Sequence, residues 1–408
     1  MSGSGGAISP ARQALKASGG GVLAVAVVLA VVWSAGLLDR PHARAAASAD
    51  GLPHTSVEAA PGKCGRGWTR PRTGTQVFEL HNGSDRPSEV YLKDPRTGAV
   101  YGEVEGLGPG TTRALRADLG AGSYAFACFP DDAAPVTGPT VRVHGGKGGH
   151  GGPAAVPVSQ HDLIPPTLKY QHWVGGRMDP LVEDTRKLRS AVESGDLAAA
   201  RKAWLPAHLD YERMGAAYGT FGDADGAVNG TTAGLPGGVH DKDFTGFHRL
   251  EQGLWHDEPA ASLRPVADRL LKDVRTLRKD WSEARMDPLD LGLRAHEIME
   301  NTVQFELTGR TDYGSGSNLA TARANLDGTR GALTRLRPLL TSRYPRLPRL
   351  DRQLDRTEGV LDRQRHEGRW TPLDALGRTQ REKVNAEVGR LVESLADIAA
   401  LCDTRRTS

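Results

Sequence analysis

The hydrophobic period of this chain changes once, across a glycine-rich stretch at residues 144–156. Before this stretch, apolar residues alternate with polar ones in short runs such as 76–80, 89–92 and 123–128. Alternation with a period of two is the pattern of half-buried β-strands. After it, from Leu163 to Leu401, apolar residues recur every three or four positions, which is the pattern of helices with one buried face. The sequence therefore predicts a β-domain followed by an all-α domain.

These patterns also predict where the domains begin and end. Residues 57–143 have the short strands of a small β-sandwich, and residues 144–156 have the composition of a flexible linker. Residues 157–405 are expected to form one bundle of seven or eight helices. Helices often carry proline in their first turn. Three pairs are therefore predicted helix starts: Asp179-Pro180, Asp287-Pro288 and Thr371-Pro372.

Residues 1–45 are predicted to be a secretory signal peptide or a signal anchor. Arg12 and Lys16 precede a charge-free, mostly apolar run from Val22 to Leu38, and no acidic residue occurs before Asp39. The run is long for a signal peptide and short for a membrane-spanning helix. Small-residue cleavage sites follow at residues 43–47, and they favour removal of the segment as a signal peptide. The alternative is that the segment is retained as a membrane anchor. Either outcome predicts an extracytoplasmic protein of the periplasm or cell envelope.

Charge and cysteine content narrow the function further. The 52 Lys and Arg residues are nearly balanced by 49 Asp and Glu residues, which argues against a dedicated nucleic-acid-binding protein. Cys64 and Cys128 lie near opposite ends of the β-domain. In an oxidising compartment such a pair favours a disulfide over a metal site. Cys402 remains without a predicted partner.

His248 and Glu251 are the first candidate metal ligands. They lie three residues apart on a predicted helix and so share one face, with about 5–6 Å between their Cβ atoms. Imidazole and carboxylate groups are ordinary ligands of first-row metals. The flanking residues Phe244, Leu254 and Trp255 are apolar. The pair is therefore expected to point into a packed interior, where ionisable groups need a partner or a metal.

Glu212 and Asp225 are further candidates from an earlier part of the helical domain. Glu212 follows His208 by four residues on one helix face, and Asp225 comes after glycines that are expected to break that helix. Facing helices that each supply Glu and His ligands are a known way to build a metal site in a helical bundle. The alternatives are a salt bridge for Glu212 and a surface position for His208. The predicted metal ligands are thus His248, Glu251, Glu212 and, less strongly, Asp225.

Gly246, His248 and Glu251 together meet the pattern G-x-H-x-x-E, and the helical half of the chain resembles the imelysin family. Five segments extend this resemblance: 204–213, 218–223, 244–255, 296–301 and 311–317. They are similar to the imelysin-family members that serve Efe-type iron uptake, in which a cupredoxin-like domain precedes the imelysin domain. The resemblance implies a multidomain β + α fold, with a cupredoxin-like β-sandwich followed by an all-α imelysin bundle.

The resemblance also implies a function. A protein of this kind would capture ferrous or ferric iron outside the cell membrane for a membrane iron permease, with a secreted haem peroxidase as a further partner. His248 and Glu251 would be iron ligands, joined by Glu212 from the facing helix and by Asp225. Carboxylates suit iron in both oxidation states, and the imidazole also suits zinc or copper.

The β-domain departs from a copper-binding cupredoxin. A blue-copper site needs a Cys, two His and usually an axial Met. After Cys128 no His or Met precedes the predicted strand at Val141. The expectation is a cupredoxin-like fold without its copper.

Two other functions stay open as alternatives: a metallopeptidase-like protein, and an envelope scaffold with a vestigial metal site. A zincin helix carries H-E-x-x-H, whereas here the next histidine, His256, lies five residues beyond Glu251. A serine nucleophile elbow is also missing from the sequence. The sequence therefore favours a binding protein over an enzyme.

Overall fold

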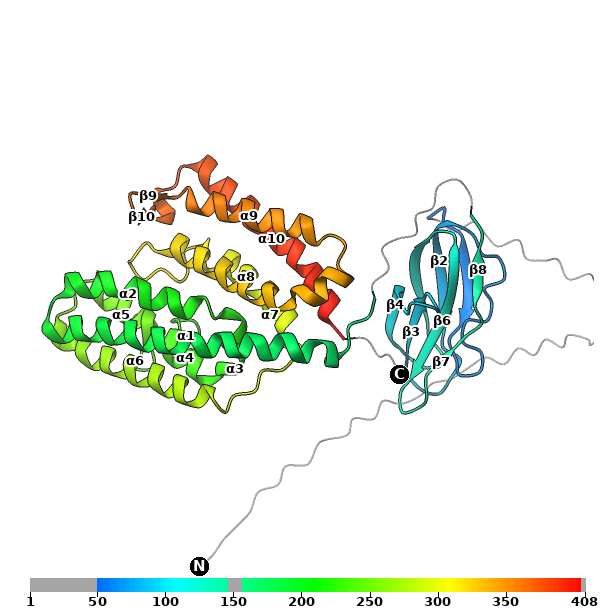
Figure 1. Cartoon of the computed structure of the whole chain (residues 1–408), viewed down its shortest axis with the longest axis horizontal. Helices are drawn as coiled ribbons and strands as arrows, with labels where there is room; N and C mark the ends of the chain where they lie inside the picture. The colour runs from blue at the N-terminus through cyan, green and yellow to red at the C-terminus, as the bar shows by residue number, and fades with distance from the viewer. Residues whose placement is uncertain (1–49, 146–155, 405–408) are drawn as a thin grey trace, which may run out of the picture. The chain divides into compact units, whose positions relative to one another are not determined.

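The computed structural model describes residues 50–145 and 156–404. The predicted signal segment 1–45 and positions 146–155 of the predicted linker lie outside the described residues. Within them, a β-sheet region precedes a helical region (Figure 1), which is the order that the change of hydrophobic period predicts.

The β-sheet region contains two sheets. In the first, β1 (His54–Glu58) pairs in parallel with β2 (Gly74–His81), which pairs antiparallel with β5 (Thr112–Leu119). The second has the order β4 (Val100–Leu107), β3 (Ser88–Lys93), β6 (Gly122–Pro130) and β7 (Val136–Thr137), and β8 (Val141–Val143) pairs with β6. β1 begins three residues before the predicted start of the domain.

An aromatic cluster and a disulfide join the two sheets. Phe78 of β2 and Phe126 of β6 lie with their ring centroids 5.2 Å apart, and Trp68 packs on both at 4.9 and 5.8 Å. The predicted disulfide between Cys64 and Cys128 is confirmed. Because Cys128 is bonded to Cys64, its sulfur is not a free thiolate for a copper ion. The cupredoxin-like identity of this region remains a prediction.

Among the described residues, eight helices contain ten or more residues, which agrees with the seven or eight expected. They are α1 (Gln160–Ser194), α2 (Leu197–Glu212), α5 (Gly246–Trp255), α6 (Ala260–Trp281), α7 (Asp290–Asn301), α8 (Asn318–Arg343), α9 (Leu347–Asp362) and α10 (Arg378–Cys402). The short helices α3 (Tyr218–Phe221) and α4 (Asp223–Asn229) lie between α2 and α5. A hairpin of β9 (Arg365–His366) and β10 (Arg369–Trp370) follows α9.

The predicted helix start at Asp179-Pro180 is wrong, because α1 runs through Pro180. The helix begins instead at Ser159, whose side chain and that of Asp162 form a capping box. It ends at Gly195, which has the left-handed conformation of a C-terminal cap. Proline removes one backbone hydrogen bond, but α1 packs against both α2 and α6 along a continuous buried stripe. That packing outweighs the local penalty.

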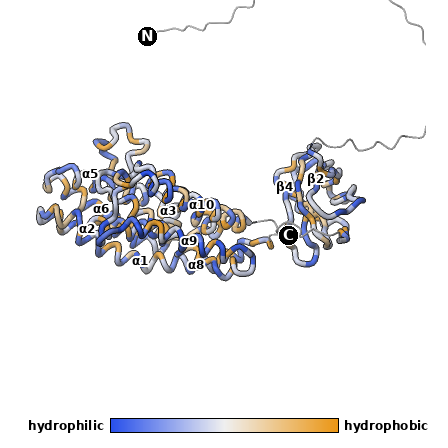
Figure 2. Tube along the Cα trace, turned by 90° about the horizontal axis from the view of Figure 1, so that it is seen from above, coloured by the Kyte–Doolittle hydropathy of each residue, from blue (hydrophilic) through white to orange (hydrophobic). Residues whose placement is uncertain are grey.

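The helices form one core. α1, α2, α5 and α6 lie side by side, α7, α9 and α10 pack together, and α8 contacts both sets (Figure 1). Hydrophobic and hydrophilic residues alternate along these helices at short intervals (Figure 2), as expected for helices with one buried face. No helix in the described part of the chain is both long and apolar enough to cross a membrane.

Candidate metal centre

Gly246 fixes how α5 enters the core. Its φ is +81°, a left-handed conformation that side chains other than glycine rarely adopt. A Cβ atom at this position would lie 2.3 Å from the carbonyl oxygen of Val228 in α4. The glycine of the G-x-H-x-x-E pattern therefore lets the start of α5 pack closely on α4. This contact directs the next turn of α5 into the bundle.

His248 and Glu251 both point inward, as their spacing predicts. They are buried, and Nδ1 of His248 lies 3.2 Å from Oε2 of Glu251. The other oxygen of Glu251, Oε1, accepts hydrogen bonds from the backbone N–H groups of Tyr313 and Ser315, both at 3.1 Å, and from the Ser315 hydroxyl at 2.5 Å. Burial raises the pKa of Glu251, but hydrogen bonds from His248 and Ser315 outweigh it and hold the pKa below its usual value.

His208 and Glu212 form a second buried pair, at the end of α2. Nε2 of His208 lies 3.0 Å from Oε1 of Glu212, and Asn229 donates to the same oxygen at 2.7 Å. Burial disfavours the charged forms of His208 and Glu212, but the hydrogen bond between them stabilises the charged form of each. The pKa of His208 is therefore raised and that of Glu212 lowered. The two histidine rings lie 5.2 Å apart, which brings the α2 and α5 pairs together.

Glu306 is a buried carboxylate that the sequence patterns do not identify. It ends the π-helix η3 (Thr302–Glu306) and accepts hydrogen bonds from Thr311 at 2.6 Å and Asn318 at 3.0 Å. Burial and the charge of nearby Glu212 raise the pKa of Glu306 to about 7. Its flanks contain no ligand-type residue at helical spacing within η3. Only its charge, between the apolar residues Phe305 and Leu307, is a sequence signal.

Three of these side chains reach the same cavity. A cavity of about 180 Å³ is lined by Glu212, His248 and Glu306, together with Asn229, Asn325 and Thr311. Asp225 lies in α4, and its carboxylate accepts a hydrogen bond from the Tyr211 hydroxyl at 2.5 Å. Burial raises the pKa of Asp225 to about 6. The structure therefore places Glu212 and His248 at one cavity, Glu251 against His248, and Asp225 against Tyr211.

The carboxylates around this cavity are held by protein partners. Across residues 50–145 and 156–404, no three His, Cys, Asp or Glu side chains are grouped closely enough to hold a metal ion. Glu212 accepts a hydrogen bond from Asn229, and Glu306 accepts hydrogen bonds from Thr311 and Asn318. An ion entering the cavity would therefore have to draw at least one carboxylate from its present partner.

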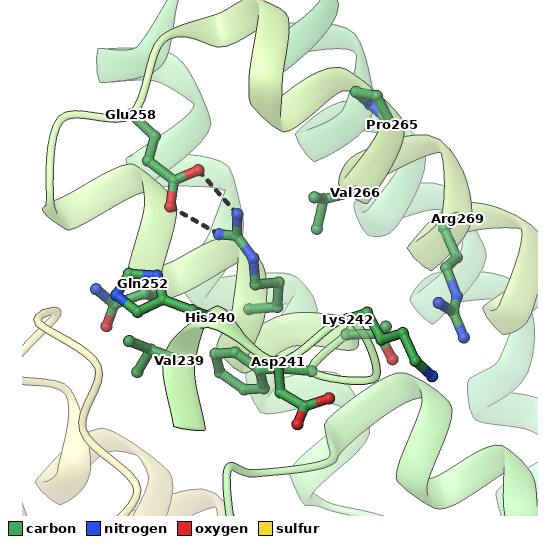
Figure 3. A pocket seen from close by; sticks show the side chains of 12 residues that line it. Val239, His240, Asp241, Lys242, Gln252, Glu258, Pro265, Val266 and Arg269 are labelled. Carbon is green, nitrogen blue, oxygen red and sulfur yellow. Dashed lines mark hydrogen bonds and ion pairs between the residues drawn. The ribbon is translucent and has the colours of Figure 1, made fainter. Parts of the chain in front are cut away.

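A neighbouring face of α5 lines a second, larger cavity of about 450 Å³ (Figure 3). Arg249 and Gln252 of α5 border it, and Arg249 forms two hydrogen bonds with Glu258, at 3.0 and 2.9 Å. Lys242 and Arg269 contribute further positive charge from a loop and from α6. The two faces of α5 thus differ in chemistry. The inner face carries the buried His–Glu pair, and the outer face carries a partly exposed ion pair.

The model of the imelysin family matches residues 167–400, which is more than half of the chain. The match contains all four predicted ligands and Glu306. Among solved structures, an imelysin-like protein from Psychrobacter arcticum is 14% identical, with a TM-score of 0.41. That comparison covers 59% of this chain and 94% of the other.

Two curated relatives extend over nearly the whole chain. The iron uptake system component EfeO of Yersinia pseudotuberculosis is 27% identical over 89% of this chain and 95% of its own length. The protein of the same name from Escherichia coli O157:H7 is 26% identical over 86% of this chain and 92% of its own length. Both comparisons therefore include residues from the β-sheet region as well as from the helical region.

Proposed function

The chain belongs to the imelysin family, and from this premise we propose that it captures ferrous or ferric iron outside the cytoplasm for a membrane iron permease. The system would be of the Efe type, with a secreted haem peroxidase as a further partner. The observation that carries this proposal is the pair of buried His–Glu contacts, one on α2 and one on α5, beside a single cavity. Relatives named as iron uptake components support the same pathway.

The chemistry of the cavity supports a cation as cargo. Isolated ionisable groups are unfavourable in a protein interior unless they are paired or bind a metal. Here Glu212 and Glu306 both reach a cavity of about 180 Å³, together with His248. Carboxylate oxygens suit iron in both oxidation states, and an imidazole nitrogen also suits zinc and copper. Asp225 is the weakest of the proposed ligands, because its carboxylate contacts Tyr211.

Binding is favoured over peptidase activity. His256, the only histidine shortly after the motif, ends α5 at an exposed position, and its Nδ1 contacts the carbonyl oxygen of Gln252 at 2.8 Å. It therefore does not supply the second histidine of a zincin site. Curated relatives are named for iron uptake. This name favours iron binding over both alternatives, the peptidase and the envelope scaffold.

Replacing both His248 and Glu251 by alanine tests the proposal. We expect the wild-type chain to bind one iron ion tightly and the double variant to lose this phase in calorimetric titrations. The physical reason is that the substitutions remove two of the predicted metal ligands, an imidazole and a carboxylate. Circular dichroism should show unchanged helicity.

Gln252→Ala is the matched control, since Gln252 lies on the same helix but lines the other cavity. This variant should bind iron like the wild type. An unchanged affinity in the double variant would show that the iron site lies elsewhere. Cleavage of casein by the wild-type chain would instead favour the peptidase alternative.

A further inference from the structure

Glu251 makes four polar contacts within the protein, three of them through Oε1. An ionised carboxylate offers about four lone-pair sites on its two oxygens. Oε1 receives the two backbone N–H groups and the hydroxyl group contributed by Tyr313 and Ser315, and Oε2 faces Nδ1 of His248. The side chain is 1% exposed. Oε1 is therefore saturated by the 313–315 loop, Oε2 faces His248, and Glu251 does not line the 180 Å³ cavity.

This arrangement gives Glu251 a different function. Histidines that bind metals through one ring nitrogen commonly donate the other N–H to a carboxylate, which fixes the tautomer and the ring orientation. Glu251 contacts Nδ1 of His248, so Nε2 is the nitrogen left for a ligand. His248 itself lines the 180 Å³ cavity, whereas Glu251 lies on the protein side of the imidazole. Ser315 in turn holds the orienting carboxylate.

Glu306 meets the requirements for a ligand better than Glu251 does. It lines the same cavity as Glu212 and His248, but comes from a third segment, η3. Each of its oxygens has one protein donor, Thr311 for Oε1 and Asn318 for Oε2, so lone pairs remain on both. A π-helix is rare and often marks a functional site. Here it places a carboxylate beside Glu212, and two nearby carboxylates favour a cation between them.

We propose that Nε2 of His248, Glu212 and Glu306 bind the ion, and that Glu251 is a positioning residue that Ser315 holds against His248. This assignment rests on the proposed iron-binding function and adds to it which side chains touch the ion. The three ligands are not grouped closely enough in the present arrangement. The ion is therefore expected to draw these three side chains closer together when it enters.

The test compares isosteric variants of the full-length chain. Glu306→Gln and Glu251→Gln should each weaken iron(II) binding by about ten-fold or more, since outer partners of ligands also matter for affinity. Glu300→Gln is the matched control, because Glu300 lies on α7 just before η3 and its side chain is partly exposed. It should bind iron like the wild type. Thermal melts confirm that each variant is folded.

Copper(II) as a spectroscopic probe separates a ligand from a positioning residue. The wild type and Glu306→Gln should both show the hyperfine coupling of a coordinated imidazole nitrogen in electron paramagnetic resonance. Glu251→Gln should change or lose this coupling, because the amide oxygen would stay with the N–H donors of Tyr313 and Ser315 and the NH2 group, which cannot accept the proton of Nδ1, would face His248. Ser315→Ala should show a weaker form of the same change, and Ser315→Thr should restore the wild-type signal.

A crystal structure with iron bound gives an answer that does not depend on variants. We expect an oxygen of Glu212, an oxygen of Glu306 and Nε2 of His248 to coordinate the metal, and no oxygen of Glu251 among the ligands. A metal bond from Glu251, or wild-type affinity in Glu306→Gln, overturns the assignment while leaving iron binding intact. A wild-type chain that binds no iron overturns the proposed function itself.

Discussion

At the scale of single residues, sequence spacing identified the side chains that share a helix face. His248 and Glu251, and His208 and Glu212, lie on common faces because residues three or four apart on a helix are neighbours. Gly246 belongs to the same pattern for another reason, its positive φ and its contact with α4. Such a role is invisible without the structure, since it depends on a carbonyl group 18 residues away.

Glu306 shows what spacing cannot reveal. Its hydrogen-bond partners, Thr311 and Asn318, lie in the following loop and in α8, and the cavity joins it to α2 and α5. None of these contacts has a helical period in the sequence. Asp225 illustrates the opposite difficulty. Its position in the chain made it a candidate ligand, whereas its nearest polar partner is the hydroxyl of Tyr211.

Cys402 provides a prediction at this scale. It is buried against Gly292 of α7, and burial raises the pKa of its thiol to about 12. At pH 8 the folded protein would therefore hold only about 10⁻⁴ of the thiol as thiolate, against roughly a quarter for an ordinary cysteine. We expect iodoacetamide to alkylate the native protein about 10³-fold more slowly than the unfolded, unreduced protein.

Mass spectrometry measures this difference directly. With the Cys64–Cys128 disulfide intact, the unfolded chain should gain one adduct, and peptide mapping should place it on Cys402. Raising the pH from 8 to 9 should accelerate the native reaction about ten-fold, because the thiolate fraction rises ten-fold per pH unit below the pKa. Equal rates in the folded and unfolded protein would contradict the burial of this thiol.

At the scale of secondary-structure elements, the strength of the hydrophobic pattern decided what could be predicted. The alternating runs at 76–80, 89–92 and 123–128 lie within β2, β3 and β6. β1 gave a weaker signal, because only Val57 among its five residues is fully buried. In the structure, β1 is defined by its parallel pairing with β2. This pairing joins segments that are separated in the sequence. The helix start predicted at Asp179-Pro180 is wrong, because the packing of α1 outweighs the local preference of proline for the first turn of a helix.

The disulfide gives a prediction for the β-sheet region. It links Cys128 of β6 to Cys64, which lies ahead of β2, and closes a loop with a sequence separation of 64 residues. In the chain-entropy model such a cross-link stabilises the folded state by about 4 kcal/mol. We expect the variant Cys64→Ala/Cys128→Ala to lose about 2–4 kcal/mol in the unfolding free energy of this region, measured with denaturant.

The helical region is the internal control for this measurement. Its own core contains neither cysteine of the disulfide, so its helical unfolding signal should shift little in the double variant. A two-dalton mass increase on reduction of the wild type should accompany the loss of stability. A variant as stable as the wild type would mean that the disulfide adds no net stability, for example because the unfolded chain is already compact.

At the scale of the whole molecule, the two regions have separate cores. One cluster of buried residues runs from Val57 to Val143, and another from Val158 to Cys402. All four predicted ligands and Glu306 belong to the helical region. Because a region with its own core is able to fold alone, iron binding is expected to depend on the helices only. We expect the β-sheet region to serve the proposed delivery of iron instead.

Deletion of residues 51–143 tests this division of labour. The shortened protein should bind iron within a few-fold of the wild-type affinity, since Glu212, His248 and Glu306 keep their surroundings. It should fail to support iron uptake in cells that depend on this protein, at equal abundance in the same compartment. Full uptake by the shortened protein would make the β-sheet region dispensable. Loss of iron affinity would instead mean that the β-sheet region supplies part of the site, and the placement of every ligand on helical segments would then be wrong.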